Sequence, residues 1–197
     1  MSARIVLITH GSTSSLRRGG FPGDEHLDEA GRQLARAHPL SVHAATRLLT
    51  APTRSSRETA ELLGLAAQPG PALDDWDLGS WRGRPPDSVD PAALSAWLSS
   101  ATAKPHGGES LAELIQRTGD WLASQADGRV IAVVSAAVAR ALIVSALALR
   151  ADAFWRIDLA PLTAAVLSGT GSRWNLRSCG QPLDSLPALN RRDRRGA

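Results

Sequence analysis

The sequence has a single cysteine, Cys179, among its 197 residues. One thiol cannot form an intrachain disulfide, and the same count excludes a metal site built from several cysteines. Cys179 also has no obvious base beside it in the sequence. We therefore interpret it as an incidental thiol rather than a nucleophile.

Long apolar runs are also missing. None approaches the roughly 18 residues that a membrane-spanning helix needs. Near the N-terminus, the apolar stretch 5–8 has only the length of a strand, and neither a basic segment nor a cleavage site flanks it. These absences predict a cytoplasmic protein that does not enter a membrane.

Charge is only slightly unbalanced. The net charge is +3, and much of the excess lies in the segment 191–195 near the C-terminus. A short basic end of this kind is typically a solvated tail. The six tryptophans do not alternate with basic residues as they do on base-stacking surfaces, so we expect no nucleic-acid partner. With 43% hydrophobic and 21% charged residues, the composition is that of an ordinary globular protein.

Short apolar segments alternate with amphipathic ones along the chain. Strands are predicted at 4–8, 46–50, 129–134, 164–168 and 173–177, and helices at 27–37, 55–63, 91–99, 110–125 and 137–149. This order predicts an α/β fold, a three-layer sandwich with a mostly parallel central sheet. Residues 1–180 are predicted to form a single domain, and 181–197 a flexible tail.

Two of these helices and one of the connecting segments allow more detailed predictions. Ser110 is expected to cap the helix 110–125, with Glu113 at the capping-box position. The segment 13–25 is polar and rich in glycine, and is predicted to be a loop. The inward face predicted for the helix 27–37 consists of Leu27, Ala30, Leu34 and Ala37.

The first predicted strand is followed by Thr9-His10-Gly11-Ser12-Thr13. A histidine at the carboxyl end of a strand lies where α/β sheets form their ligand crevices. The segment resembles the signature of the histidine phosphatase (phosphoglycerate mutase-like) superfamily, which reads Arg-His-Gly, then a hydroxyl or acid, then Thr. The chain has Thr9 where that family has arginine.

Segments similar to the family's other motifs follow in the same order. His26-Leu27-Asp28 and Gly31 fit the start of the family's first helix, and Pro52, Thr59 and Ala60 fit its second motif. Ser55 stands at the position of the second motif's arginine, between Arg54 and Arg57.

The later motifs are similar in part. The third motif corresponds to Asp75-Trp76-Asp77-Leu78-Gly79-Ser80-Trp81-Arg82-Gly83, in which Asp75 has the position of the family's acid. Gly108-Glu109-Ser110 matches the family's Gly-Glu-Ser. The last motif, His-Gly-Gly-x-x-Arg, reads Ser135-Ala136-Ala137-Val138-Ala139-Arg140, so that Ser135 replaces the second histidine.

The resemblance implies a phosphohydrolase that acts through a phosphohistidine. His10 is the implied nucleophile and Asp75 the acid that protonates the leaving oxygen. The transferred phosphoryl group needs cations around it, and we predict Arg54 or Arg57 as its clamp. Arg17 and Arg18 are further candidates to replace the missing cations. Ser135, at a predicted helix N-terminus, can offer a hydroxyl and backbone N–H groups.

The implied substrate is a small phosphorylated metabolite, a small-molecule anion. The chain has no room for the insertions of the glycolytic mutases, which favours a phosphatase. The chemistry requires neither a metal nor a cofactor. The positions predicted to bind the substrate are Thr9, Gly11, Thr13, Arg54, Arg57, Glu109, Ser135 and Ala136.

The substitutions at Thr9 and Ser135 keep other interpretations open. One is a catalytically altered pseudophosphatase, and another is a repurposed enzyme that uses His10 and Asp75 on a non-phosphorylated substrate.

Trp76 and Trp81 are more typical of a core than of a substrate platform, and a surface position is favoured for His106. The oligomeric state stays open, with a dimer among the alternatives. Purely structural roles of the candidate residues also stay open. Asp75 could cap a turn, Arg54 and Arg57 could be solvated side chains, and Glu109 could support its own loop.

Overall fold

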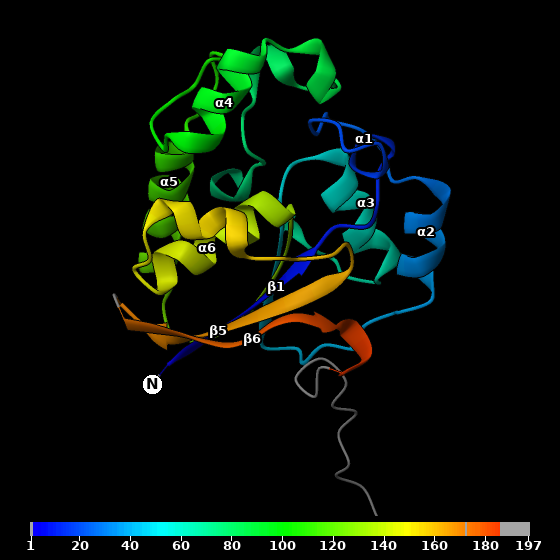
Figure 1. Ribbon diagram of the computed structural model, residues 1–197. Helices are drawn as coiled ribbons and strands as arrows, with labels where there is room; N and C mark the ends of the chain where they lie inside the picture. The colour runs from blue at the N-terminus through cyan, green and yellow to red at the C-terminus, as the bar shows by residue number, and fades with distance from the viewer. Residues whose placement is uncertain (1, 172, 186–197) are drawn as a thin grey trace, which may run out of the picture.

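A computed structural model of the chain describes residues 2–171 and 173–185, and it consists of one sheet with helices around it (Figure 1). The strands are β1 (Ala3–Thr9), β2 (Thr46–Thr50), β3 (Gln68–Pro69), β4 (Gly128–Val134), β5 (Thr163–Thr170) and β6 (Arg173–Pro182). The α-helices are α1 (Ser14–Arg17), α2 (Glu29–Arg36), α3 (Arg54–Leu62), α4 (Pro91–Ser99), α5 (Leu111–Ala123) and α6 (Ala136–Ala146).

The six-stranded sheet has the order β3-β2-β4-β1-β5-β6. The first four strands in this order are parallel, and β5 and β6 continue the sheet as an antiparallel hairpin. In the register of β1 with β4, Thr9 is opposite Val134. The residues that follow these two strands, His10 and Ser135, therefore emerge side by side at the carboxyl edge of the sheet.

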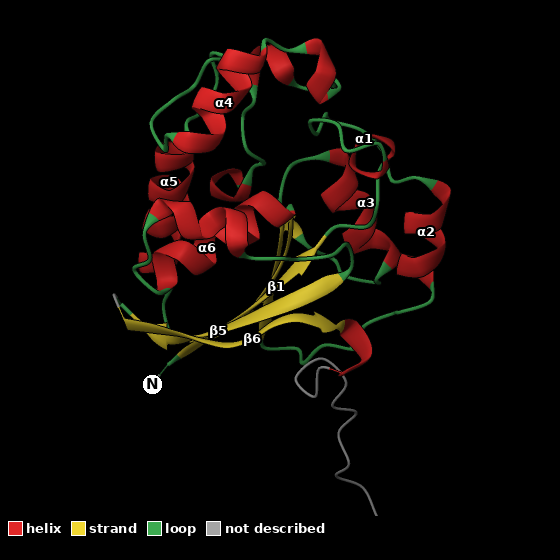
Figure 2. Cartoon of the chain, viewed as in Figure 1, coloured by secondary structure: helices red, strands yellow, loops and turns green. Residues whose placement is uncertain are grey.

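Helices cover both faces of the sheet and make a three-layer α/β sandwich (Figure 2). On β1, Ile5 and Leu7 belong to the core under α5 and α6, whereas Val6 and Ile8 belong to the core under α2 and α3. Both faces of β1 are thus buried, which explains its continuous apolar sequence. The predicted fold class is confirmed.

The structure places most elements where the sequence predicted them. Ser110 Oγ accepts from the Glu113 amide at 3.2 Å, and the Glu113 carboxylate accepts from the Ser110 amide at 2.7 Å, as predicted. The predicted loop 13–25, however, contains the short helix α1, whose N-cap is Thr13. No helix in the described part of the chain is long and apolar enough to cross a membrane.

The folded part also extends beyond residue 180. The strand β6 runs to Pro182, and the next residue, Leu183, is buried in the core under α2 and α3. The rest of the predicted tail, 186–197, lies outside the described residues.

The predicted inward face of α2 is wrong. Leu27 is buried, but Ala30 and Ala37 are exposed and Leu34 is 47% exposed. The helix instead packs through Gly31 and Ala35. A Cβ atom at Gly31 would lie 2.5 Å from the Ser12 carbonyl oxygen, so the helix backbone approaches the segment after His10 more closely than a larger residue allows.

An aromatic cluster joins α4, the irregular segment 71–88 and the segment Ala151–Arg156. Trp76 and Trp81 are buried in it and pack on Trp97, at centroid distances of 5.0 and 5.8 Å. His106 packs on Trp81 at 5.3 Å and is 3% exposed, so the expectation of a surface position is corrected. His106 Nδ1 accepts a hydrogen bond from the Gly108 amide at 3.1 Å, which leaves the proton of the neutral ring on Nε2.

The buried imidazole makes stability depend on pH. Burial lowers the pKa of His106 from its usual 6.5, with Asp77 raising it and Lys104 lowering it further. Above pH 6.5 the ring is neutral in both the folded and the unfolded chain; below it, the unfolded chain binds the proton first. We expect the free energy of unfolding to decrease as the pH falls from 7.5 to 5.5.

The His106→Asn variant should show a smaller decrease, because the asparagine carbonyl can still accept from the Gly108 amide but does not titrate. Denaturant unfolding at several pH values measures both proteins. An equal decrease in the two would contradict the assignment to His106.

Candidate active site

A cavity of about 380 Å³ lies at the carboxyl edge of the sheet. Its walls come from the segment after β1, the loop 20–22, the start of α6 and the loop that precedes β5. The lining residues are Thr9, His10, Thr13, Leu16, Gly20, Pro22, Asp75, Ser135, Ala136, Ala137, Arg140, Asp158, Leu159, Ala160 and Pro161. The structure therefore brings together six of the predicted site residues: Thr9, His10, Thr13, Asp75, Ser135 and Ala136.

The backbone holds the His10 ring in one tautomer. Its amide donates to the Val134 carbonyl at 2.9 Å, which ties the residue to the end of β4. Nδ1 lies 2.7 Å from the Gly11 carbonyl oxygen. A carbonyl can only accept, so Nδ1 carries the proton, and in the neutral ring Nε2 has the free electron pair.

The N-terminus of α6 also opens on the cavity. Ser135 is the N-cap, and its hydroxyl oxygen accepts from the Val138 amide at 3.2 Å. Because a hydroxyl can accept and donate at once, its proton is still available to a ligand. The amides of Ala136 and Ala137 belong to the first turn, which an α-helix leaves without intrahelical acceptors. This end of the helix is suited to an anion.

Arg140 is a lining residue that the sequence analysis did not choose. It stands one turn into α6 from the N-cap, with a side chain 26% exposed. Its buried Nε has no hydrogen-bond partner among the described residues, and its nearest carboxylate, that of the exposed Asp158, is 4.0 Å away. Burial lowers the pKa of Arg140, whereas Asp158 raises it. Arg140 matches the arginine of the family's last motif, and that match was the signal available in the sequence.

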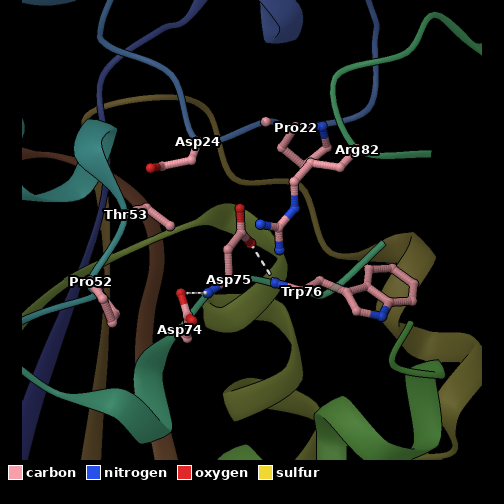
Figure 3. A pocket seen from close by; sticks show the side chains of 9 residues that line it. Pro22, Asp24, Pro52, Thr53, Asp74, Asp75, Trp76 and Arg82 are labelled. Carbon is pink, nitrogen blue, oxygen red and sulfur yellow. Dashed lines mark hydrogen bonds between the residues drawn. The ribbon is translucent and has the colours of Figure 1, made fainter. Parts of the chain in front are cut away.

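Asp75 stands between this cavity and a second one of about 190 Å³ (Figure 3). Arg82 also lines the second cavity, and its guanidinium pairs with Asp77, Nη2 to Oδ1 at 3.4 Å. One carboxylate oxygen of Asp75 accepts from the Trp76 amide at 2.7 Å. The carboxylate is thus held at a turn and is also exposed to the cavity that contains His10.

A half-buried ion pair supports the turn that contains Asp75. Arg117 forms a bidentate pair with Glu109, with both N–O distances 2.8 Å. The same guanidinium donates to the carbonyls of Ala72 and Asp74, at 2.9 and 3.1 Å. The hydrogen bond with Glu109 raises the pKa of Arg117. Glu109 therefore supports the turn, and it is not among the residues that line the cavity.

Two other predicted residues near His10 have structural partners. The Gly11 amide donates to Thr59 Oγ1 at 3.0 Å, and Gly11 does not line the cavity. Thr9 lines it, but its hydroxyl donates to the Ala160 carbonyl at 2.7 Å and accepts from the Thr163 amide at 3.1 Å. Gly11 has no side chain, and the one hydroxyl proton of Thr9 is already donated to Ala160.

Neither arginine of the predicted clamp lines the cavity. The side chain of Arg54 pairs with Asp24, Nε to Oδ2 at 3.4 Å, and Arg57 is exposed on α3. Arg17 pairs with Asp28 at 2.8 Å. None of these side chains, nor that of Arg18, lines the cavity. Among its described lining residues, Arg140 is the single arginine or lysine.

In residues 2–171 and 173–185, no group of three or more His, Cys, Asp or Glu side chains is placed to hold a metal ion. The lining residues instead offer an imidazole, a carboxylate, a guanidinium and a helix N-terminus. This set can transfer a group from an anionic substrate to a histidine without a metal.

Comparisons with known proteins identify similar chains. The family description "Histidine phosphatase superfamily (branch 1)" matches residues 5–182. A glucosyl-3-phosphoglycerate phosphatase from Mycolicibacterium vanbaalenii is 30% identical over 171 residues, which are 76% of each chain.

Solved structures of two phosphatases are similar to this chain in fold. A mycobacterial glucosyl-3-phosphoglycerate phosphatase in complex with VO3 has a TM-score of 0.75 and 27% identity, covering 90% of this chain and 98% of that one. A phosphoserine phosphatase from Entamoeba histolytica has a TM-score of 0.77 at 15% identity, covering 90% of this chain and 96% of that one. The second likeness shows the fold alone.

Proposed function

The chain belongs to the histidine phosphatase superfamily (branch 1), and on that premise we propose that it hydrolyses small phosphomonoesters through a phosphohistidine at His10. The phosphatase relatives support phosphohydrolysis in general. The observation that carries the proposal is the hydrogen bond from His10 Nδ1 to the Gly11 carbonyl, because it makes Nε2 the nucleophilic nitrogen of a residue that lines the cavity.

In the first step, the Nε2 electron pair of His10 forms a bond to phosphorus and the ester P–O bond breaks. The ester oxygen takes its electrons and receives a proton from Asp75, so the product leaves as a neutral alcohol. In the second step, a water molecule attacks phosphorus and the N–P bond breaks. Asp75 accepts the proton of that water, and both residues return to their starting states.

The phosphoryl oxygens would be held by Arg140, by the Ser135 hydroxyl and by the first amides of α6. These donors are fixed before the substrate arrives, and they face the charge that spreads over the phosphoryl group in the transition state. In this proposal Arg140 supplies the cation, and the Ser135 hydroxyl supplies a hydrogen-bond donor where the family has its second histidine. The proposed substrate is a phosphorylated metabolite, and the relatives' names make a phosphorylated sugar-glycerate one substrate to assay.

The proposal is tested by the release of inorganic phosphate from a panel of phosphomonoesters. Release should be inhibited competitively by vanadate, which resembles the transition state of phosphoryl transfer. A folded protein that releases no phosphate from any member of the panel would contradict the proposal.

Arg140→Met should reduce kcat/KM about tenfold to a hundredfold, because a charge-assisted hydrogen bond contributes about 1.5–3 kcal/mol. Methionine retains much of the aliphatic stem of Arg140, whose guanidinium carbon lies over the Phe154 ring at 5.9 Å from its centroid. Arg150→Met, at a side chain 90% exposed and outside the cavity, is the matched control. An unchanged kcat/KM in folded Arg140→Met would show that the phosphoryl group binds elsewhere.

A second candidate is a pseudophosphatase that binds an anion without turnover. It is favoured by the single cation among the described lining residues, since the family's arginine and second histidine are replaced by Thr9 and Ser135. Titration with phosphate, followed by tryptophan fluorescence, separates the two. Binding without hydrolysis of any phosphomonoester supports the pseudophosphatase, and binding with hydrolysis supports the enzyme.

A further inference from the structure

Part of the cavity wall is apolar. It is formed by Leu16 of α1, Pro22 of the following loop, and the segment Leu159-Ala160-Pro161 before β5. Leu159 is 4% exposed and belongs to the core under α5 and α6, so this wall is continuous with the interior of the protein. A ligand that fills this part of the cavity contacts carbon atoms rather than hydrogen-bonding groups.

The charges in the cavity disfavour a second anionic group on the substrate. The proposed phosphoryl site uses Arg140, the single basic side chain among the described lining residues apart from the imidazole of His10. The remaining charged lining residues, Asp75 and Asp158, are both acidic. Among the described lining residues, a carboxylate on the leaving group would find no second arginine or lysine to pair with, and it would face at least one carboxylate of the same sign.

Thr9 fixes the apolar wall relative to His10. Besides the two hydrogen bonds of its hydroxyl with Ala160 and Thr163, its carbonyl accepts from the Leu162 amide at 3.2 Å. The residue next to the proposed nucleophile is therefore bonded to the loop that forms the wall. The position at which the family has arginine here orders a surface for the leaving group.

We infer that the natural substrate is a phosphomonoester whose leaving group is uncharged and largely apolar. This inference rests on the proposed function and deepens it by naming the class of substrate. A cavity of about 380 Å³ lies in the range of about 300–1,000 Å³ typical of small-molecule sites. Burial of the leaving group against Leu16, Pro22 and Leu159 would supply binding free energy, while Arg140 and α6 hold the phosphoryl group.

Two substrates that differ by one carboxylate test the inference. Benzyl phosphate and 4-carboxybenzyl phosphate have the same phosphoryl group and the same kind of benzylic leaving oxygen. We expect the kcat/KM of the wild-type protein to be at least about tenfold higher for benzyl phosphate, chiefly through KM, because the added carboxylate loses its hydration without gaining a partner.

A charge-introducing variant should weaken this preference. Leu16 is 48% exposed, so Leu16→Lys should fold normally while placing an ammonium group at the wall. The ratio of kcat/KM for 4-carboxybenzyl phosphate to that for benzyl phosphate should rise at least about threefold. Leu34→Lys on α2, at a leucine 47% exposed and outside the cavity, is the matched control and should leave the ratio unchanged.

The possible results separate the inference from the proposed function. Equal kcat/KM for the two substrates in the wild type, with no change of the ratio in Leu16→Lys, would overturn the inference and leave phosphohydrolysis standing. The absence of phosphate release from these and all other phosphomonoesters would overturn the proposed function itself. A preference for benzyl phosphate that Leu16→Lys reduces and Leu34→Lys does not would support both.

Discussion

His10→Ala is expected to lower kcat for phosphomonoester hydrolysis by at least about 10³-fold, because no second imidazole lines the cavity among the described residues to accept the phosphoryl group. The fold should survive, since the ring bonds only to the Gly11 carbonyl among the described residues and the backbone bond to Val134 is unaffected. Phosphate release under saturating substrate measures the effect.

The covalent intermediate gives a second readout for the same residue. Rapid denaturation in alkali preserves a phosphohistidine, and the peptide that contains His10 should gain the mass of one phosphoryl group in the wild type. His43→Ala, which changes an exposed histidine far from the cavity lining, should keep both the activity and the mass shift. Wild-type turnover in His10→Ala would show that a different group is the nucleophile.

Asp75→Asn should lower kcat by about 10²–10⁴-fold on alkyl phosphates, whose alkoxide leaving groups need a proton. On p-nitrophenyl phosphate the loss should be much smaller, because nitrophenolate leaves readily without one. Asparagine retains an oxygen that can accept from the Trp76 amide, so the turn should keep its shape.

The neighbouring Asp74→Asn is the matched control. Asp74 is exposed, lines only the second cavity of Figure 3, and caps the amide of Asp75 at 2.9 Å through an oxygen that asparagine keeps. It should retain wild-type activity on both substrates. Equal losses on alkyl and p-nitrophenyl phosphates in Asp75→Asn would show that Asp75 positions the substrate and is not the acid.

Short-range features were predicted well because their causes lie close together in the chain. The apolar strand β1, buried on both faces, and the capping box of Ser110 with Glu113 depend on residues within a few positions of one another. The proximity of His10 and Ser135 also follows from two strands that end at the same edge of a parallel sheet.

The inward face of α2 shows where such reasoning fails. The periodicity favoured Leu34, but the contact is made at Gly31, where the helix backbone lies against the Ser12 segment. Which face of a short helix is buried depends on the element it packs against, and that element is distant in the sequence or has no signature of its own.

By itself, the sequence determined the α/β fold and the position of His10 at the carboxyl end of a strand, and the family resemblance pointed to Asp75. The tertiary structure decided which charged groups reach them. Arg54 forms an ion pair with Asp24, thirty positions away, and Thr9 is hydrogen-bonded to a loop more than 150 positions away. Arg140, by contrast, remains in the cavity with an unpaired Nε. A side chain's partners are set by distances in space, and local sequence carries no measure of those distances.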